Sequence, residues 1–262
     1  MNENAFLLHH IQRPEDRVIV MKVINKAMSV KKSFAPKYTD FLDPYQLSLS
    51  IPILQKFHDI RFTIPEKYHD PERNIFLIYP DFLDEKDIEC PLQALRIQGD
   101  YHNHDISHRD VLGSVLGLGI KREKIGDIII HDKQVDIVVL SEISNYIEVH
   151  LNKISKYPVS IHQISFDEIN RKDDKFKVIQ TTVQSLRLDA ILSSGFGESR
   201  TSISRFINHD RVKVNWKPIN SGDYLLKEGD IISFQGRGRL ILNQVGNKTK
   251  SNRFRIVIHR MI

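Results

Sequence analysis

The sequence has little cysteine and no long apolar run, and each absence excludes a class of protein. Cys90 is the one cysteine among 262 residues, which excludes an intrachain disulfide framework and a cysteine-rich zinc site. The longest apolar runs, such as Ile75–Tyr79 and Ile137–Leu140, are far shorter than the roughly 20 residues that a membrane-spanning helix needs. Residues 1–10 lack the pattern of a signal peptide. We therefore expect a cytoplasmic protein with no membrane partner.

The motifs of common enzyme and metal sites are also missing. Residues 102–108 contain three histidines and Asp105, but their spacing is loose and no second ligand group completes a metal site. His108-Arg109-Asp110 resembles a kinase catalytic loop, yet no Gly-rich phosphate loop or Asp-Phe-Gly accompanies it. A Ser/His/Asp triad stays open, although no nucleophile elbow occurs. We predict no metal, no cofactor and no enzyme activity.

The charge is distributed unevenly along the chain. The net charge is +5, but residues 183–262 hold 14 Lys and Arg against 6 Asp and Glu, a net +8. The remaining residues hold 24 against 27, a net −3. A basic C-terminal region favours a nucleic-acid partner there.

Residues 1–75 are predicted to form a small N-terminal α/β domain. Apolar residues recur near helical spacing after Pro14, and the lysine-rich stretch Lys26–Lys37 is predicted as a loop or basic edge. Tyr38–Pro44 fits a strand that leads into a helix begun by proline. Two further strands are predicted, at Ile60–Ile64 and Ile75–Tyr79. No catalytic constellation occurs, so packing or a protein partner is favoured over a nucleic-acid site.

Residues 76–170 are predicted to form a central domain with the split βαβ, ferredoxin-like order of strands and helices. Its predicted elements are strand Leu92–Ile97, helix Ser107–Leu118, strands Asp127–Ile130 and Val135–Leu140, helix Ser141–Ile154 and strand Ser160–Ile164. RNA-recognition modules use this fold, but the third strand lacks the aromatic residues on which such modules stack bases. If this domain binds RNA, base stacking on these strands is not expected.

A basic cluster follows the first helix of the central domain. Lys121, Arg122 and Lys124 come just after the Gly-rich helix exit, and Arg109 lies at the helix start. These four residues are a possible second RNA contact. A solvated loop of lysines explains the composition equally well.

Residues 171–182 are predicted as a mixed-charge linker, although a short strand through Phe176–Ile179 fits as well. Residues 183–262 are predicted to form two short helices on a small antiparallel sheet, so the whole chain belongs to the α+β class. Ser199 suits an N-cap of the second helix, whose apolar residues fall on one stripe. Arg200, Ser204, Arg205 and Asn208 lie on the opposite arc.

The following strand alternates between apolar and basic residues. Val212, Val214 and Trp216 are predicted to face one side, and the residues between them the other, so that helix and strand form one joint basic surface. The candidate RNA-binding residues are Arg187, Arg200, Ser204, Arg205, Asn208, Arg211, Lys213, Asn215, Lys217, Arg237 and Arg239. Backbone phosphates are the expected targets, since basic side chains on such a surface position a protein on RNA without specifying its sequence.

These motifs resemble the RNA-binding domain named after small-subunit ribosomal protein four, here called the S-four domain. The matching motifs are Arg187-Leu188-Asp189, Ser199-Arg200, Val212-Lys213-Val214-Asn215 and Gly229-Asp230. The resemblance implies that the two helices and the next hairpin bind the RNA backbone. Asp210 stands where the family usually has Gly at the helix end, and Asp tolerates the positive φ expected there.

The whole chain resembles the YlmH-type proteins of Gram-positive bacteria. They combine a segment like His108-Arg109-Asp110 followed by Gly117–Arg122 with a C-terminal S-four domain, and Phe41–Pro44 fits their N-terminal region. The resemblance implies rRNA and tRNA partners and binding to the large ribosomal subunit with stalled peptidyl-tRNA, in ribosome-associated quality control. It also implies a link to cell division.

Two other functions stay open. The S-four domain also occurs on pseudouridine synthases, and Arg187-Leu188-Asp189 superficially resembles their catalytic Arg-Leu-Asp. Since this triplet sits in the S-four helix, Asp189 is expected to cap or orient Arg187 instead. A division-linked adaptor that binds protein rather than RNA is the other alternative.

Overall fold

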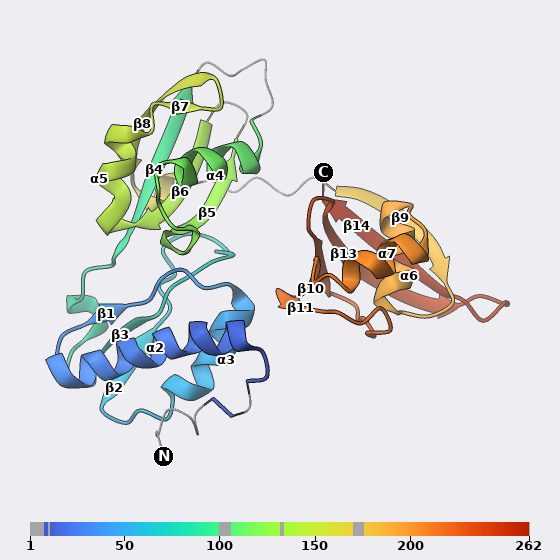
Figure 1. The fold of residues 1–262 in the computed structure, drawn as a ribbon, viewed down its shortest axis with the longest axis horizontal. Coiled ribbons are helices and arrows are strands. Elements are labelled where there is room, and N and C mark those ends of the chain that lie inside the picture. The colour runs from blue at the N-terminus through green and yellow to red at the C-terminus, as the bar shows by residue number, and fades with distance from the viewer. Residues whose placement is uncertain (1–7, 10, 100–105, 132–133, 170–175, 262) are drawn as a thin grey trace. The chain divides into compact units, whose positions relative to one another are not determined.

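The computed structural model describes residues 8–9, 11–99, 106–131, 134–169 and 176–261. The chain forms two compact units, Met1–Lys172 and Asp173–Ile262. The predicted N-terminal and central regions both lie in the first unit (Figure 1, blue to yellow-green). None of the helices in the described ranges is long and apolar enough to cross a membrane.

The N-terminal part of the first unit packs two helices against a small antiparallel sheet. Its elements are α2 (Pro14–Ser33), β1 (Lys37–Tyr38), α3 (Pro44–Leu54), β2 (Ile60–Thr63) and β3 (Leu77–Pro80), with strand order β1-β3-β2. The helix begun by Pro44 is confirmed, and Asp43 caps it through a capping box with Gln46. The strand before it is shorter than predicted, since β1 covers only Lys37–Tyr38. The loop predicted from Lys26 is wrong, because α2 continues to Ser33 and buries Ala27 and Val30.

The central part has the predicted split βαβ topology. Its elements are β4 (Leu92–Gly99), α4 (His108–Gly117), β5 (Ile125–Ile130), β6 (Gln134–Leu140), α5 (Ser141–His150), β7 (Lys153–Ile154) and β8 (Tyr157–Ile164), with short helices η1 (Glu85–Asp87), η2 (Arg122–Lys124) and η3 (Phe166–Glu168). The sheet order is β5-β6-β4-β8-β7, and its pairings are antiparallel. The second helix ends at His150 rather than Ile154, because Lys153 and Ile154 pair with β8 across a turn in which Ser155 has a φ of 56°.

The face of this sheet that α4 and α5 leave open is covered by the N-terminal part and by η3. Ala94, Val138 and Leu140 are fully buried there, in a cluster that includes Phe41 and Ile75. The surface on which RNA-recognition modules stack bases is therefore closed in this protein. The structure agrees with the expectation that these strands do not stack bases.

Gly126 leaves no room for a side chain between the two parts of the first unit. A Cβ at this position of β5 would lie 2.6 Å from Phe41 Cε1 and 3.1 Å from the Val138 carbonyl oxygen. We expect Gly126→Ala to lower the free energy of unfolding of this unit by about 1–3 kcal/mol, the usual cost of overpacking a closed core. Urea unfolding measures it, with Gly113→Ala as control because nothing lies near that Cβ. Equal stability of both variants would contradict this packing.

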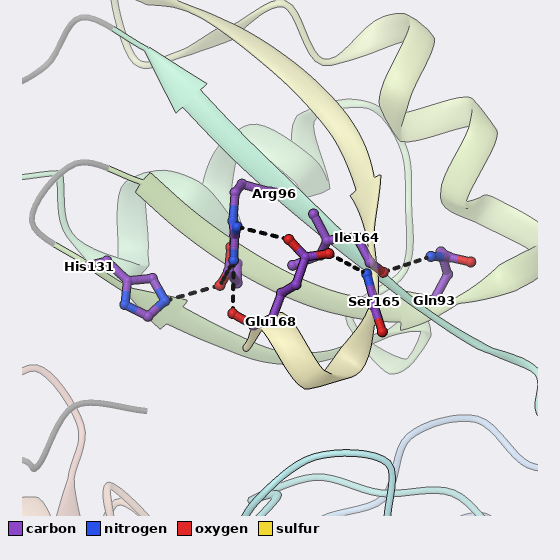
Figure 2. A network of polar contacts seen from close by, with 7 residues as sticks. Gln93, Arg96, His131, Ile164, Ser165 and Glu168 are labelled. Carbon is purple, nitrogen blue, oxygen red and sulfur yellow. Dashed lines mark hydrogen bonds and ion pairs between the residues drawn. The ribbon is translucent and has the colours of Figure 1, made fainter. Parts of the chain in front are cut away.

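A buried ion-pair network joins β4, β6 and η3 (Figure 2). Arg96 on β4 donates from Nε and Nη2 to the Asp136 carboxylate at 2.8 and 3.0 Å, and from Nη2 to the Glu168 carbonyl oxygen at 3.0 Å. His131 Nε2 lies 3.1 Å from Asp136 Oδ2. Asp136 is fully buried, so its carboxylate takes its hydrogen bonds from these partners rather than from water.

The second unit packs two helices on one face of a six-stranded antiparallel sheet (Figure 1, orange to red). Its elements are β9 (Phe176–Val183), α6 (Leu188–Phe196), α7 (Arg200–Ile207), β10 (Val212–Val214), β11 (Lys217–Pro218), β12 (Ile231–Phe234), β13 (Gly238–Lys248) and β14 (Phe254–Met261), in the order β11-β10-β12-β13-β14-β9. The linker prediction is wrong from Phe176 onward, because residues 176–183 form an edge strand paired along its whole length with β14. The strand considered as an alternative at Phe176–Ile179 is thus present and longer. Residues 171–175 lie outside the described residues.

Candidate nucleic-acid interface

Helix α7 presents the predicted cationic arc. Ser199 caps it by accepting a hydrogen bond from the Ser202 N–H at 3.2 Å, and Ile203 and Ile207 are fully buried. Arg200 and Arg205 are exposed, and neither forms an ion pair with another described residue. Asn208 is exposed too, and Ser204 is half-buried. These side chains can therefore contact a ligand without first breaking an internal salt bridge.

Arg211 lies beside the end of α7 and contacts an aromatic ring of that helix. Its guanidinium lies 5.7 Å from the ring centre of Phe206, near the end of α7. Asp210 before it has a φ of 54°, which confirms the positive φ expected at this helix end. We call Arg200, Ser204, Arg205, Asn208 and Arg211 the α7 surface.

The strand after α7 does not complete a joint surface as predicted. Val212 and Val214 of β10 are buried under the helices, so Lys213 projects from the opposite side of the sheet. The alternation stops before Trp216, because Asn215 and Trp216 both have positive φ in the turn to β11. Lys217 pairs with Val214 and so projects at the sheet edge toward the helix side. Lys213 therefore lies on the face away from α7, whereas Lys217 lies on the helix side at the edge of the sheet.

Asn215 has a structural role in that turn. Its amide nitrogen donates to Asp230 Oδ1 at 2.9 Å, and its amide oxygen accepts from the Ile231 N–H at 2.9 Å. The motif Gly229-Asp230 therefore serves to hold the β10–β11 turn. We omit Asn215 from the proposed RNA contacts, because both ends of its amide are engaged.

Substituting Asn215 tests this role. We expect Asn215→Ala to destabilise the second unit by about 1–3 kcal/mol, since it removes two hydrogen bonds and disfavours positive φ. RNA affinity of the folded variant should stay near that of the wild type. Asn215→Gly is the matched control, because glycine restores the φ preference but not the hydrogen bonds. Thermal unfolding and RNA titration separate the two effects, and a loss of RNA affinity at unchanged stability would contradict the structural role.

Two other predicted contacts are paired with carboxylates. Arg187 forms a two-point ion pair with Asp189, with both N–O distances 3.2 Å, and this hydrogen bonding raises the pKa of Arg187. The expected orienting role of Asp189 is confirmed. Arg237 Nη2 lies 2.8 Å from Glu198 Oε1, at the α6–α7 connection. Both arginines are already partly neutralised, so they are weaker candidates than Arg200 and Arg205.

The basic cluster in the first unit is mostly engaged within the protein. Lys124 Nζ lies 2.8 Å from Asp40 and 2.6 Å from Glu142, and Arg122 donates to the carbonyl oxygens of Ile125 and Gly126. Burial, followed by the nearby charge of Arg73, lowers the pKa of Arg122 to about 10. Arg109 and Lys121 are exposed, so they are the members of this cluster that can face a ligand.

The residues considered for a metal or a kinase-like loop have other roles or positions. Asp110 and Ser107 form the N-terminal capping box of α4, which lowers the pKa of Asp110 through hydrogen bonds from Ser107. His102, His104 and Asp105 lie outside the described residues. Among the residues that the structure does describe, no group of three or more potential ligands could hold a metal ion.

Family models match three successive parts of the chain. They are described as "YlmH, N-terminal" for residues 15–83, "Putative RNA-binding domain in YlmH" for residues 85–168, and "S4 domain", the S-four domain, for residues 186–232. The chain belongs to the YlmH family. The matches confirm the recognition made from the sequence motifs, including the C-terminal S-four domain.

Proteins similar to this chain have names that refer to translation or to cell division. "Ribosome-associated protein quality control protein P2" of Bacillus subtilis is 29% identical over 249 residues, which are 95% of this chain and 96% of the relative. The solved structure of "Cell division protein ylmH from Streptococcus pneumoniae" is 26% identical with a TM-score of 0.52, and the match covers 61% of this chain and 97% of that one. "Small ribosomal subunit protein uS4" of Paracoccus denitrificans is 38% identical over 64 residues, 23% of this chain and 31% of the relative.

The outer strands of this sheet extend beyond the matched S-four segment. Strands β9, β13 and β14 lie outside residues 186–232, the part matched by the S-four model. The register of β14 with β9 and β13 places side chains of all three strands together on the outer side of the sheet.

Proposed function

We propose that this YlmH-family protein binds structured RNA through the phosphate backbone at the α7 surface, as a binding protein rather than an enzyme. One observation carries the proposal: Arg200 and Arg205 are exposed on one helix with no internal ion pair among the described residues, whereas Arg187 and Arg237 are paired. Arginine suits phosphate because its planar guanidinium donates two parallel hydrogen bonds. The family's putative RNA-binding and S-four domains support the same conclusion.

The partner that we propose is the large ribosomal subunit carrying peptidyl-tRNA, in the cytoplasm. The name of the Bacillus subtilis relative, which matches nearly the whole chain, supports a place in ribosome-associated quality control. Backbone contacts recognise shape rather than base sequence, so a ribosomal RNA junction or a tRNA stem fits this surface. Arg109 and Lys121 are a second proposed contact on the first unit.

Salt dependence tests the phosphate mechanism. The three arginines of the α7 surface and Lys217 at the neighbouring edge can neutralise up to about four phosphates, so the logarithm of the association constant should fall with log salt at a slope of about −3 to −4. Titration of a labelled tRNA between about 50 and 200 mM salt measures this slope. A slope near zero, at measurable affinity, would contradict binding through phosphates.

A second candidate function is a division-linked adaptor for another protein, supported by the name of the Streptococcus pneumoniae neighbour. The N-terminal part would then hold the partner. Affinity capture from cells with and without RNase distinguishes the two functions. Partners that persist after RNase and after charge reversal of the α7 surface would favour the adaptor.

A further inference from the structure

The face of the C-terminal sheet that points away from α6 and α7, here called the outer sheet face, combines cations with apolar and aromatic side chains. Register places these side chains in rows across the strands. One row is Lys213, Ser233 and Arg239, the next is Ile231, Ile241, His259 and Val178, and beyond it come Val257 with Gln180 and Arg255 with Thr182. The alternate residues Ile232, Leu240, Ile256 and Ile258 are buried under the helices.

Aromatic groups lie at both ends of this face. The rings of Phe176 and His259 stack with their centres 4.9 Å apart and an angle of 26° between them. Phe176 is 40% exposed and Val178 is 54% exposed. Toward the other edge, the Arg239 guanidinium lies 5.7 Å from the ring centre of Trp216, while its Nε donates to Ser233. Phe176 is exposed, whereas His259 and Trp216 are half-buried, and the accessible parts of these rings offer flat surfaces for stacking.

The charges on this face have one sign. Its rows contain Lys213, Arg239 and Arg255 and no carboxylate. A second copy of the same face would bring these cations together, which disfavours self-association. A partner with both negative charge and flat apolar surfaces is complementary, and a single-stranded nucleic acid has both, since each nucleotide carries a phosphate and a base.

We propose that the outer sheet face binds a single-stranded RNA segment, with bases stacked on the Phe176–His259 pair and on Trp216, and with phosphates near Lys213, Arg239 and Arg255. This surface lies across the sheet from the α7 surface. It is built largely from strands that the S-four match does not include. The protein therefore has separate surfaces for a structured RNA and for an adjoining unpaired strand.

The test removes the aromatic pair and leaves the formal charge unchanged. In Phe176→Ala, His259→Ala, affinity for a labelled single-stranded oligonucleotide of about twelve residues should fall about 10-fold, since the bases lose the rings on which they stack. Affinity for a tRNA should stay within about 2-fold. The matched control is Tyr146→Ala, His150→Ala. These two rings form a pair on the exposed side of α5, and their centres are 4.4 Å apart. This control should change neither affinity.

A second variant keeps the test decisive if loss of the pair weakens the fold. Arg255 is exposed at the far row, so Arg255→Glu leaves the core intact and should lower single-strand affinity several-fold. Unchanged single-strand binding in a folded variant of either kind overturns the proposal. A wild-type dimer that becomes a monomer in either variant would also overturn the proposal, because the outer sheet face would then be a contact between protein chains. Substitutions on the α7 surface should lower the affinity for structured RNA, and substitutions on the outer sheet face should lower the affinity for the single strand. Failure of one proposal is therefore distinguishable from failure of the other.

Discussion

Reversing the charge of Arg200 and Arg205 together should weaken binding to a structured RNA such as tRNA by about 100-fold. Each arginine is expected to donate charge-assisted hydrogen bonds to phosphate, worth about 1.5 kcal/mol or more per contact. Two lost contacts correspond to about 3 kcal/mol, which is a factor of about 100 in affinity. Both side chains are exposed on α7 and outside the core, so Arg200→Glu, Arg205→Glu should fold normally.

A matched charge control separates a local surface from overall electrostatic attraction. Lys248→Glu, Lys250→Glu changes the net charge equally, and these lysines lie at the tip of the β13–β14 hairpin (Figure 1). Lys248 lies 4.7 Å from the Phe254 ring centre, so some stability is lost as well. We expect a loss of affinity of less than about 10-fold in this control, from the general field alone. Equal losses in both variants would contradict a defined α7 surface.

Removing the carboxylate of Asp136 should destabilise the first unit by about 3–5 kcal/mol. Asp136→Ala leaves the charged guanidinium of Arg96 mostly buried and without its carboxylate partner. Removing one partner of a buried ion pair destabilises a protein more than replacing both partners with apolar residues. The Arg96 side chain is 13% exposed and Asp136 is fully buried, so water replaces the lost contacts poorly. Denaturant unfolding of the full chain, followed by a probe in the first unit, measures the change.

Two controls locate the effect in the pair itself. Glu168 lies 3.5 Å from Arg96 and its side chain is 51% exposed, so Glu168→Ala should cost only about 1 kcal/mol. The double variant Arg96→Met, Asp136→Leu should recover most of the loss, since it removes both buried charges at once. A change of less than about 1 kcal/mol in Asp136→Ala would show that the network contributes little.

Patterns within one element predicted most of the fold. Period-two and helical spacing located the strands and helices of the central domain, and their order gave the sheet topology. The failures have tertiary or competing local causes. Lys26, Lys31 and Lys32 lie on the exposed side of a helix that buries Ala27 and Val30 between them, so the helix runs through the lysine-rich stretch. Strand β9 follows a charged stretch and pairs with β14 near the chain end, so no local pattern reveals its full length.

The candidate site was predictable where one helix carries it. A single helical wheel places Arg205 opposite the buried stripe of Ile203 and Ile207. Arg200 lies beside that stripe on the wheel, and it is exposed at the first position of the helix. Predicting whether the helix and the strand share one surface required knowing which side of β10 faces the helices. Because Val212 and Val214 are buried, Lys213 must lie on the far side. The role of Asn215 depends on Asp230, a residue of another loop, and spacing alone does not reveal that hydrogen bond.

Crosslinking in cells tests the central claim most directly. Wild-type protein, the Arg200→Glu, Arg205→Glu variant and the Lys248→Glu, Lys250→Glu control would be expressed equally, irradiated with ultraviolet light, and their bound RNA sequenced. Binding to the large subunit through the α7 surface predicts crosslinks to large-subunit ribosomal RNA and tRNA. These crosslinks should be lost in the α7 variant and kept in the control. Crosslinks that are absent, or unchanged by the α7 substitutions, would contradict the proposed function.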